Sequence, residues 1–242
     1  MNTVIPFHKQ TAMISKPLID GNYKFTVAEF NIFFCALGQL AQSKAIELDT
    51  RITVTTEQYA ELRGVSKQTA IEALEEAREG LWKKYVVLPD KETGKNMRVR
   101  ILYKMEDKMD SSITFVFSPE FLEFICEMKR YITCELGVLG KFNSFYSYRL
   151  LFMVVERSSY SRNFEFRLTL EEFNKKFCLE GKYGNIAELK RRVILPAISE
   201  IEEYTGIELK LGFVKEGRKV IGLRFYGFNP ASKLLKKEVV EN

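Results

Sequence analysis

One order of secondary-structure elements occurs twice along the chain, and this repetition constrains the fold more than any single motif does. In each half, an amphipathic helix and a short alternating strand precede a short helix, a tight turn, a longer helix and a hairpin. The short helix, the turn and the longer helix form a helix-turn-helix, and the hairpin after them forms a wing. The sequence therefore predicts an α+β fold of two tandem winged-helix domains, residues 1–138 and 139–242, with a short C-terminal tail from about residue 230.

Capping residues set the helix ends that we expect in the first half. Thr26 and Glu29 have the spacing of a capping box ahead of a buried helix. Gly64 ends the short helix of the helix-turn-helix, and Ser66 caps the longer one. After these helices we expect three strands and one more helix, at 85–90, 97–105, 111–117 and 119–131.

The longer helix of the second half, residues 185–205, carries three adjacent cations near its start. Arg191 and Arg192 fall outside the apolar stripe of an ideal helical wheel, and Lys190 reaches past its edge. The residues of that stripe, with Ile194 beside it, are Ile186, Val193, Ala197, Ile201 and Tyr204. Pro196 removes an amide that would bond the carbonyl of Arg192, so we expect the helix to bend there.

The position of these cations favours a DNA contact over a stabilising role in the helix. The helix dipole is unfavourable to cations in the first turns, whereas a helix N-terminus flanked by arginines suits phosphates. A charged face that is solvated and paired with Glu188, Glu200 or Glu202 is the alternative for an isolated run of this kind. The helix-turn-helix and the wing that surround the run favour DNA.

The distribution of charge supports the same half of the chain. Residues 139–242 carry 19 Lys and Arg against 13 Asp and Glu, a net of +6, whereas residues 1–138 carry 18 against 19, a net of −1. A basic hairpin tip can straddle the DNA backbone or minor groove while the helix lies in the major groove. The DNA-binding residues predicted for this half are Lys182, Asn185, Glu188, Lys190, Arg191, Arg192, Lys215, Arg218 and Lys219.

The longer helix of the first half is a weaker candidate for DNA. Its exposed positions carry four carboxylates that would repel a duplex, at Glu72, Glu75, Glu76 and Glu79. Only the start of this helix is suited to DNA, and the contacts predicted there are Arg63, Lys67 and Gln68.

The residues that catalysis would need are scarce. The single histidine, His8, excludes His-based triads and metal sites with two or more histidines. Tyr146, Tyr148 and Tyr160 are candidate nucleophiles for a nicking enzyme, but no histidine pair exists to hold its metal. We therefore expect core packing or phosphate contacts for these tyrosines, with no catalytic residues, no metal and no cofactor.

Four scattered cysteines without a CxxC pair predict reduced thiols in a cytoplasmic protein. The apolar run "NIFFCALGQLA" is too short to span a bilayer, and the N-terminus lacks the pattern of a signal peptide. We expect no membrane partner.

Five segments and one short pattern, Ser-x-Tyr-Ser-x-Arg-Leu at 144–150, together carry a resemblance to a known family. The segments are "PLIDGNYKFTVAEFNIFFCALGQL", "ITVTTEQYAELRGVSKQTAIEAL", "SSITFVFSPEFLEFICEMKRYIT", "FNSFYSYRLLFMV" and "LKRRVILPAISEIEEYTGIELK". From about residue 13 to residue 228, the chain resembles the replication initiator (Rep) proteins of iteron-controlled bacterial plasmids.

The resemblance implies a sequence-specific double-stranded DNA-binding protein that binds repeated origin sequences (iterons) and starts plasmid replication. It also implies a monomer that is active in replication, a homodimer that represses its own promoter at an operator, and recruitment of the host replication initiator and helicase proteins. The recognition helices would be 185–205 and, to a lesser extent, 66–81, although the latter is more acidic than the family pattern suggests. No catalytic residues are implied. A winged-helix transcriptional regulator without an initiator role is the alternative.

The first domain offers a route to the implied homodimer. Strands 97–105 and 111–117 are long, and the first alternates apolar residues with Arg98, Arg100 and Lys104. An edge strand of this kind can pair with its two-fold mate, and its charges limit further stacking. We therefore expect dimerisation and minor DNA contacts in domain 1, and the main DNA contacts in domain 2.

Overall fold

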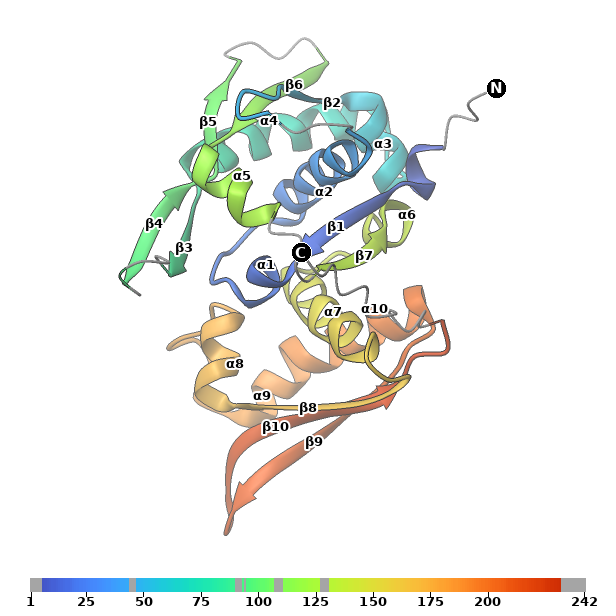
Figure 1. The fold of residues 1–242 in the computed structure, drawn as a ribbon. Helices are drawn as coiled ribbons and strands as arrows, with labels where there is room; N and C mark the ends of the chain where they lie inside the picture. Colours follow the sequence, from blue (N-terminus) through green and yellow to red (C-terminus); the bar gives the residue numbers. More distant parts are fainter. Residues whose placement is uncertain are drawn as a thin grey trace, which may run out of the picture. The chain divides into compact units, whose positions relative to one another are not determined.

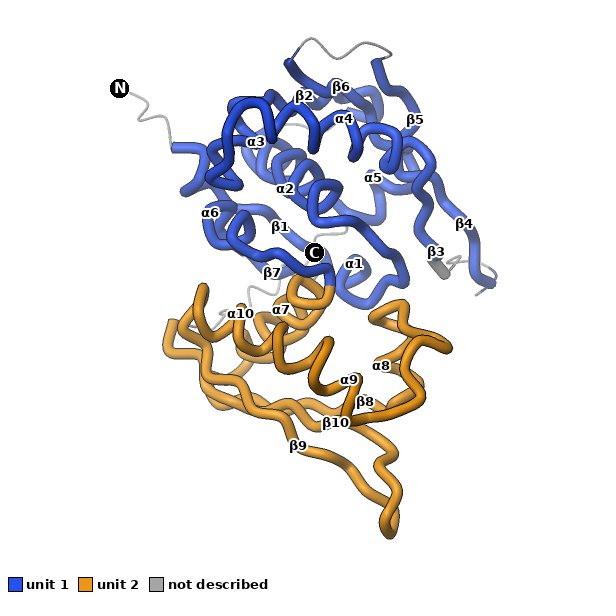
Figure 2. The backbone as a smooth tube through the Cα atoms, turned by 180° about the vertical axis from the view of Figure 1, so that it is seen from behind, with its two compact units in different colours: residues 1–145 blue, residues 146–242 orange. Residues whose placement is uncertain are grey.

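The computed structural model describes residues 6–43, 47–89, 93, 95–106, 111–126 and 131–231. The chain forms two compact units, 1–145 and 146–242 (Figure 2, blue and orange). Each unit has its own three-stranded sheet and its own helix-turn-helix.

The helices of the first unit follow the predicted caps. Thr26 and Glu29 form the capping box of α2, Val27–Gln42, and Thr55 and Gln58 form that of α3, Thr56–Arg63. Gly64 ends α3 in the left-handed region with a φ of 63°, a conformation that favours glycine. Ser66 caps α4, Lys67–Lys83, by accepting a hydrogen bond from the Thr69 amide.

Helix α2 is buried around most of its circumference, and aromatic rings make up much of its core. Phe33 packs edge-on or tilted against Phe117 and Phe121, with centroids 5.9 Å away in both pairs. Burial of each such ring is worth about 1.5–3 kcal/mol. The Glu29 carboxylate, buried in this core, accepts from the Thr26 amide at 2.7 Å and pairs with Lys84 at 2.9 Å.

The strands of the first unit differ from the prediction in one place. Strand β2, Ile52–Thr55, pairs with β6, Ser112–Phe117, which pairs in turn with β5, Leu102–Met105, so that the sheet order is β2-β6-β5. The single strand predicted at 97–105 is wrong, because the buried Ile101 interrupts it: its amide donates to the Lys84 carbonyl at 3.3 Å and its carbonyl accepts from the Ser118 amide at 2.9 Å.

The segment before Ile101 forms a separate hairpin. Strand β3, Tyr85–Pro89, pairs antiparallel with β4, Asn96–Arg100, in a two-stranded sheet, and Val87 of β3 makes one further bridge to Asn22. This hairpin is an insertion between α4 and the wing, and the wing itself is β5–β6, whose connection at 107–110 lies outside the described residues.

A second two-stranded sheet was not predicted. Strand β1, Thr11–Ser15, pairs antiparallel with β7, Tyr131–Glu135. The helix predicted at 119–131 is therefore too long: α5 spans Pro119–Ile125, residues 127–130 lie outside the described residues, and Tyr131 begins β7. The remaining short elements of this unit are a 3-10 turn at Phe7–Lys9, α1 at Lys16–Asp20 and α6 at Leu136–Leu139.

The second unit repeats the order of the first without the inserted hairpin. Helix α7, Phe145–Ser158, precedes strand β8, Asn163–Thr169, and α8, Leu170–Lys176. A helical segment with three parts follows: α9, Ile186–Leu189, the π-turn Lys190–Ile194, and α10, Leu195–Thr205. Strands β9, Glu208–Glu216, and β10, Lys219–Phe228, complete the unit.

The sheet of the second unit has the order β8-β10-β9, which matches β2-β6-β5 element by element. The helices cover one face of it (Figure 1), where Phe225 stacks between Phe166 and Phe173 at 5.2 and 6.2 Å. Both units are therefore winged helices, and the predicted α+β fold of two such domains is confirmed.

Candidate nucleic-acid interface

In the helix-turn-helix of the second unit, side chains fix both ends of the first helix and the start of the second. Thr169 and Glu172 form the capping box of α8, and the buried Arg149 donates from Nε to the Lys176 carbonyl at the other end, at 3.2 Å. Asn185 caps α9 by accepting from the Ala187 amide at 2.7 Å. The Oδ1 atom of Asn185, a predicted DNA contact, is thus occupied by the cap that starts the helix.

The longer helix is irregular immediately before its proline. The Leu195 amide donates to the Lys190 carbonyl, which is the i to i−5 bond of a π-turn. Pro196 is the second residue of α10 and lacks an amide. The irregularity expected from Pro196 therefore takes the form of a widened turn on its N-terminal side.

The π-turn changes which residues face the core. One extra residue in a turn shifts the phase of all later residues by about 100°, which an ideal wheel does not include. Leu189 and Ile198 are buried together with Val193 and Ala197, whereas Ile186 is only half-buried. The central members of the predicted stripe are therefore correct, its first and last residues, Ile186 and Tyr204, are only half-buried, and two buried residues are missing from it.

The two arginines lie on the exposed side of this helix but differ in their contacts. Arg192 Nε pairs with Glu188 Oε1 at 2.9 Å, as the alternative of a paired surface expects. Arg191 is exposed and has no ion-pair or hydrogen-bond partner among the described residues. Lys190 is half-buried, with its ammonium 5.8 Å from the Phe213 ring centroid, in a cation–π geometry that the sequence did not reveal.

The wing adds further cations beside the turn of its hairpin. Lys219 pairs with Glu216 in the last rung, and Gly217, with a φ of 58°, and Arg218 form the two-residue connection. The basic hairpin tip expected from the sequence is therefore present, with its turn at Gly217-Arg218. Three of the predicted DNA contacts are exposed here and a fourth is exposed in the turn after α8: Lys215, Arg218, Lys219 and Lys182.

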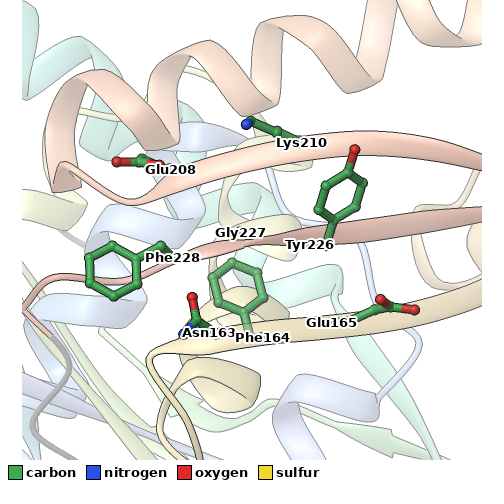
Figure 3. A pocket seen from close by; sticks show the side chains of 8 residues that line it. All are labelled: Asn163, Phe164, Glu165, Glu208, Lys210, Tyr226, Gly227 and Phe228. Atoms are coloured by element: carbon green, nitrogen blue, oxygen red, sulfur yellow. The ribbon is translucent and has the colours of Figure 1, made fainter.

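The outer face of the β8-β10-β9 sheet has a different character. A hollow of about 450 Å³ lies over the ends of the three strands, which all contribute side chains to it (Figure 3). Glu165 and Glu208 line it, and hydrogen bonds from the Arg224 guanidinium hold the pKa of Glu165 below its usual range. Two of the three charged side chains that line the hollow are carboxylates, which disfavour phosphates, so the hollow is not part of the proposed DNA interface.

In the first unit, the residues predicted to contact DNA are engaged within the unit. The Arg63 guanidinium donates to the carbonyls of Gly140 and Phe142 at 2.5 and 2.7 Å, and to Asn143 Oδ1 at 2.8 Å. Lys67 Nζ pairs with Glu57 Oε1 at 2.8 Å, and the side-chain amide of Gln68 donates to Glu72 Oε1 at 3.0 Å. The last two contacts are exposed and exchangeable, whereas Arg63 anchors a distant loop.

The three candidate tyrosines differ in their exposure. Tyr148 is buried, burial raises the pKa of Tyr146 above its usual value, and Tyr160 is exposed. Within the described part of the chain, no three His, Cys, Asp or Glu side chains gather in a way that would hold a metal ion.

All four cysteines are free, and burial raises the pKa of the Cys134 thiol to about 12. None of the described helices is both long and apolar enough to span a membrane.

Comparisons with known proteins agree with this architecture. The family described as "Initiator Replication protein, WH1" matches residues 12–155, more than half of the chain, and "Initiator Rep protein, WH2" matches residues 169–226. A replication initiation protein of Escherichia coli is 24% identical over an alignment of 233 positions that covers 93% of this chain and 70% of that protein.

Two solved structures share the fold. That of the Pi initiator protein in complex with iteron DNA has a TM-score of 0.77 at 18% identity, and covers 92% of this chain and 99% of its own. That of domains 2 and 3 of RctB has a TM-score of 0.52 at 14% identity, with 91% and 90% covered. The chain belongs to the family of initiator replication (Rep) proteins, and carries its WH1 and WH2 winged-helix domains in that order.

Proposed function

We propose that this protein binds iteron repeats at a plasmid origin as a sequence-specific double-stranded DNA-binding protein and so starts replication. The observation that carries the proposal is Arg191, an unpartnered arginine on the exposed side of the second helix of the WH2 helix-turn-helix. The likeness to the Pi initiator protein, which was solved in complex with iteron DNA, supports it.

In this proposal, the helix from Ile186 to Thr205 lies in the major groove. Arg191 bonds a guanine edge, for which a bidentate arginine is the commonest specific contact. Arg192 joins it when DNA competes with Glu188 for the guanidinium, and the released Glu188 carboxylate can accept from a cytosine amine. The helix start that Asn185 caps faces a phosphate.

The remaining cations of the second unit supply contacts that do not depend on sequence. Lys182, Lys190 and the wing residues Lys215, Arg218 and Lys219 neutralise phosphates and fix the register of the protein on the duplex. In the first unit we retain Lys67 and Gln68 as minor contacts, since their exposed partners can be exchanged for DNA. We omit Arg63, because its guanidinium already satisfies three oxygen atoms within that unit.

The assembly we propose follows the family resemblance. The monomer binds the iterons, a homodimer formed through domain 1, residues 1–138, represses the promoter, and the host initiator and helicase proteins are recruited in the cytoplasm without a catalytic step by this chain. In the structure, the single long edge strand expected for the dimer is divided into two shorter edge strands, β4 and β5. Arg98 and Arg100 on β4 keep this edge charged, as an edge in exchange between free and paired states requires.

A footprint on the DNA around the replicon's own gene tests the proposal. We expect protection of tandem direct repeats, and no nicking of supercoiled plasmid with Mg²⁺ or Mn²⁺. Protection of a promoter operator without direct repeats would instead support the transcriptional regulator, which the family match does not favour. A covalent tyrosyl–DNA product would overturn the non-enzymatic part.

A further inference from the structure

One apolar side chain lies on the proposed DNA-facing side of the recognition helix. Leu195 is 43% exposed, although it is flanked in sequence by the buried Ile194 and by Pro196. It directly follows the π-turn, and its amide makes the bond that closes this turn. A single exposed leucine is ordinary on a protein surface. Its position relative to the arginines therefore decides whether it can contact the same DNA.

Leu195 lies one turn beyond Arg191, on the same side of the helix. Residues four apart are neighbours on a helix surface, and Ala187, Arg191 and Leu195 are all exposed, whereas Leu189, Val193 and Ile194 are buried. Two consecutive residues of the π-turn, Val193 and Ile194, are buried in the core. The next residue, Leu195, therefore lies beside Arg191 and away from the apolar stripe.

The two other exposed apolar residues near the wing have different settings. Phe213 is covered by the Lys190 ammonium at 5.8 Å, and Ile221 lies in β10 at the register shift between Val220 and Gly222. A bulge re-aims a strand and accounts for an exposed side chain. Leu195 has no such local explanation, and it lies within the surface that carries the arginine pair.

We propose that Leu195 reads thymine, by packing against the C5-methyl group of a thymine next to the base that Arg191 contacts. The inference rests on the proposed function, because it takes the same helix to lie in the major groove. There thymine alone presents a methyl group among the four natural bases, and apolar side chains recognise it. Arg191 and Leu195 then form one reading unit, with a charged contact to guanine and an apolar contact to thymine.

The test uses the full-length protein and duplexes that it selects from a random library. In the best-bound duplex, deoxyuridine replaces thymidine one position at a time, which removes the methyl group and leaves base pairing intact. We expect one position, next to a guanine, at which uracil weakens wild-type binding about fourfold, the value of one buried methyl group. Leu195→Ala abolishes this uracil effect, and Leu195→Met, which keeps apolar reach, retains it.

Leu48→Ala is the matched control, since Leu48 is an exposed leucine of the first unit. This variant leaves the uracil effect at its wild-type size. An equal uracil effect in Leu195→Ala and in the wild type, or no thymine position that responds to uracil, overturns the inference while specific binding itself stands. Failure to select any sequence would instead overturn the proposed function.

Discussion

The recognition helices of the two winged-helix units differ in how they hold their charges. In the first unit, Lys67 is paired with Glu57 and Gln68 with Glu72, and the exposed side of α4 continues with further carboxylates. In the second unit, Arg191 has no partner among the described residues and Arg192 has one. The same sheet order thus carries one helix with a mostly acidic exposed side and one with exposed arginines, and under the proposed function only the second is suited to read a duplex.

The surroundings of these helices differ as well. The first unit inserts the β3–β4 hairpin between its second helix and its wing, and the second unit joins α10 directly to a basic wing. The winged-helix framework sets the placement of a helix and a hairpin in both units. Under the proposed function, side-chain charge and pairing decide which of the two units carries specificity.

The largest effect should come from the arginine pair. We expect Arg191→Ala with Arg192→Ala to weaken specific binding by roughly 2–6 kcal/mol, if each arginine makes one base contact worth 1–3 kcal/mol. Fluorescence anisotropy at fixed salt measures it, with specific and scrambled duplexes. Both side chains are exposed, so circular dichroism should show an unchanged fold.

The matched control is the same double change in the other unit. Lys67→Ala with Gln68→Ala should weaken specific and scrambled duplexes alike, by less than the arginine pair does, because these residues already have protein partners. Equal losses from the two double variants would contradict the proposed difference between the units, since both units would then contribute equally to specific binding.

The wing of the second unit should contribute affinity without specificity. Alanine at Lys215, Arg218 and Lys219 removes up to three phosphate contacts, so the slope of log K against log salt should become shallower by up to about 2.7. A titration of salt against both duplexes measures the slope. A loss confined to the specific duplex would show that the wing reads bases.

Neutral side chains on α4 should increase the affinity of the first unit for DNA and so reduce its difference from the second unit. Changing Glu72, Glu75, Glu76 and Glu79 to glutamine removes four exposed negative charges. We expect tighter binding to scrambled duplex, on the order of tenfold at low salt and less at high salt, as screening requires. An unchanged affinity at low salt would mean that α4 stays away from DNA.

Much of the fold was predictable from short-range signals. The capping boxes at Thr26 and Thr169 and the left-handed Gly64 act within four residues, so the sequence shows them directly. The β1–β7 sheet was not predicted, because it pairs Thr11 with Glu135, far away in sequence. The break at Ile101 was missed for the same reason, since its bonds to Lys84 and Ser118 depend on tertiary packing.

The candidate site was predictable in its charges and not in its geometry. The exposed Arg191 and the basic hairpin tip follow from periodicity and turn chemistry. The π-turn does not follow, because a helical wheel assumes a constant rotation per residue. The hydrogen bonds of Arg63 could not be predicted, because its acceptors, at Gly140 to Asn143, lie about eighty residues further along the chain.

The smallest effect concerns the first helix of each helix-turn-helix, which both units cap in the same way. Thr55 pairs with Gln58 in α3, and Thr169 pairs with Glu172 in α8. Thr55→Ala and Thr169→Ala should each cost about 1 kcal/mol of stability at neutral pH. Hydrogen exchange measured by mass spectrometry on peptides of α3 and α8 assigns each loss to its own unit.

Acid should then separate the two caps. Hydrogen bonds from the Thr169 amide and hydroxyl hold the pKa of Glu172 below its usual value, so the folded state binds this proton less tightly than the unfolded state does. The stability that Glu172 contributes is therefore complete above the ordinary carboxyl pKa of about 4.3 and is lost as the pH falls through the lower folded value.

Gln58 does not titrate, so α3 should keep its cap over the same range. We expect exchange in α8 to rise towards acid pH more than exchange in α3, and Glu172→Gln to remove most of that difference. Equal acid sensitivity of the two helices in the wild type would show that the titration of other carboxylates governs both units.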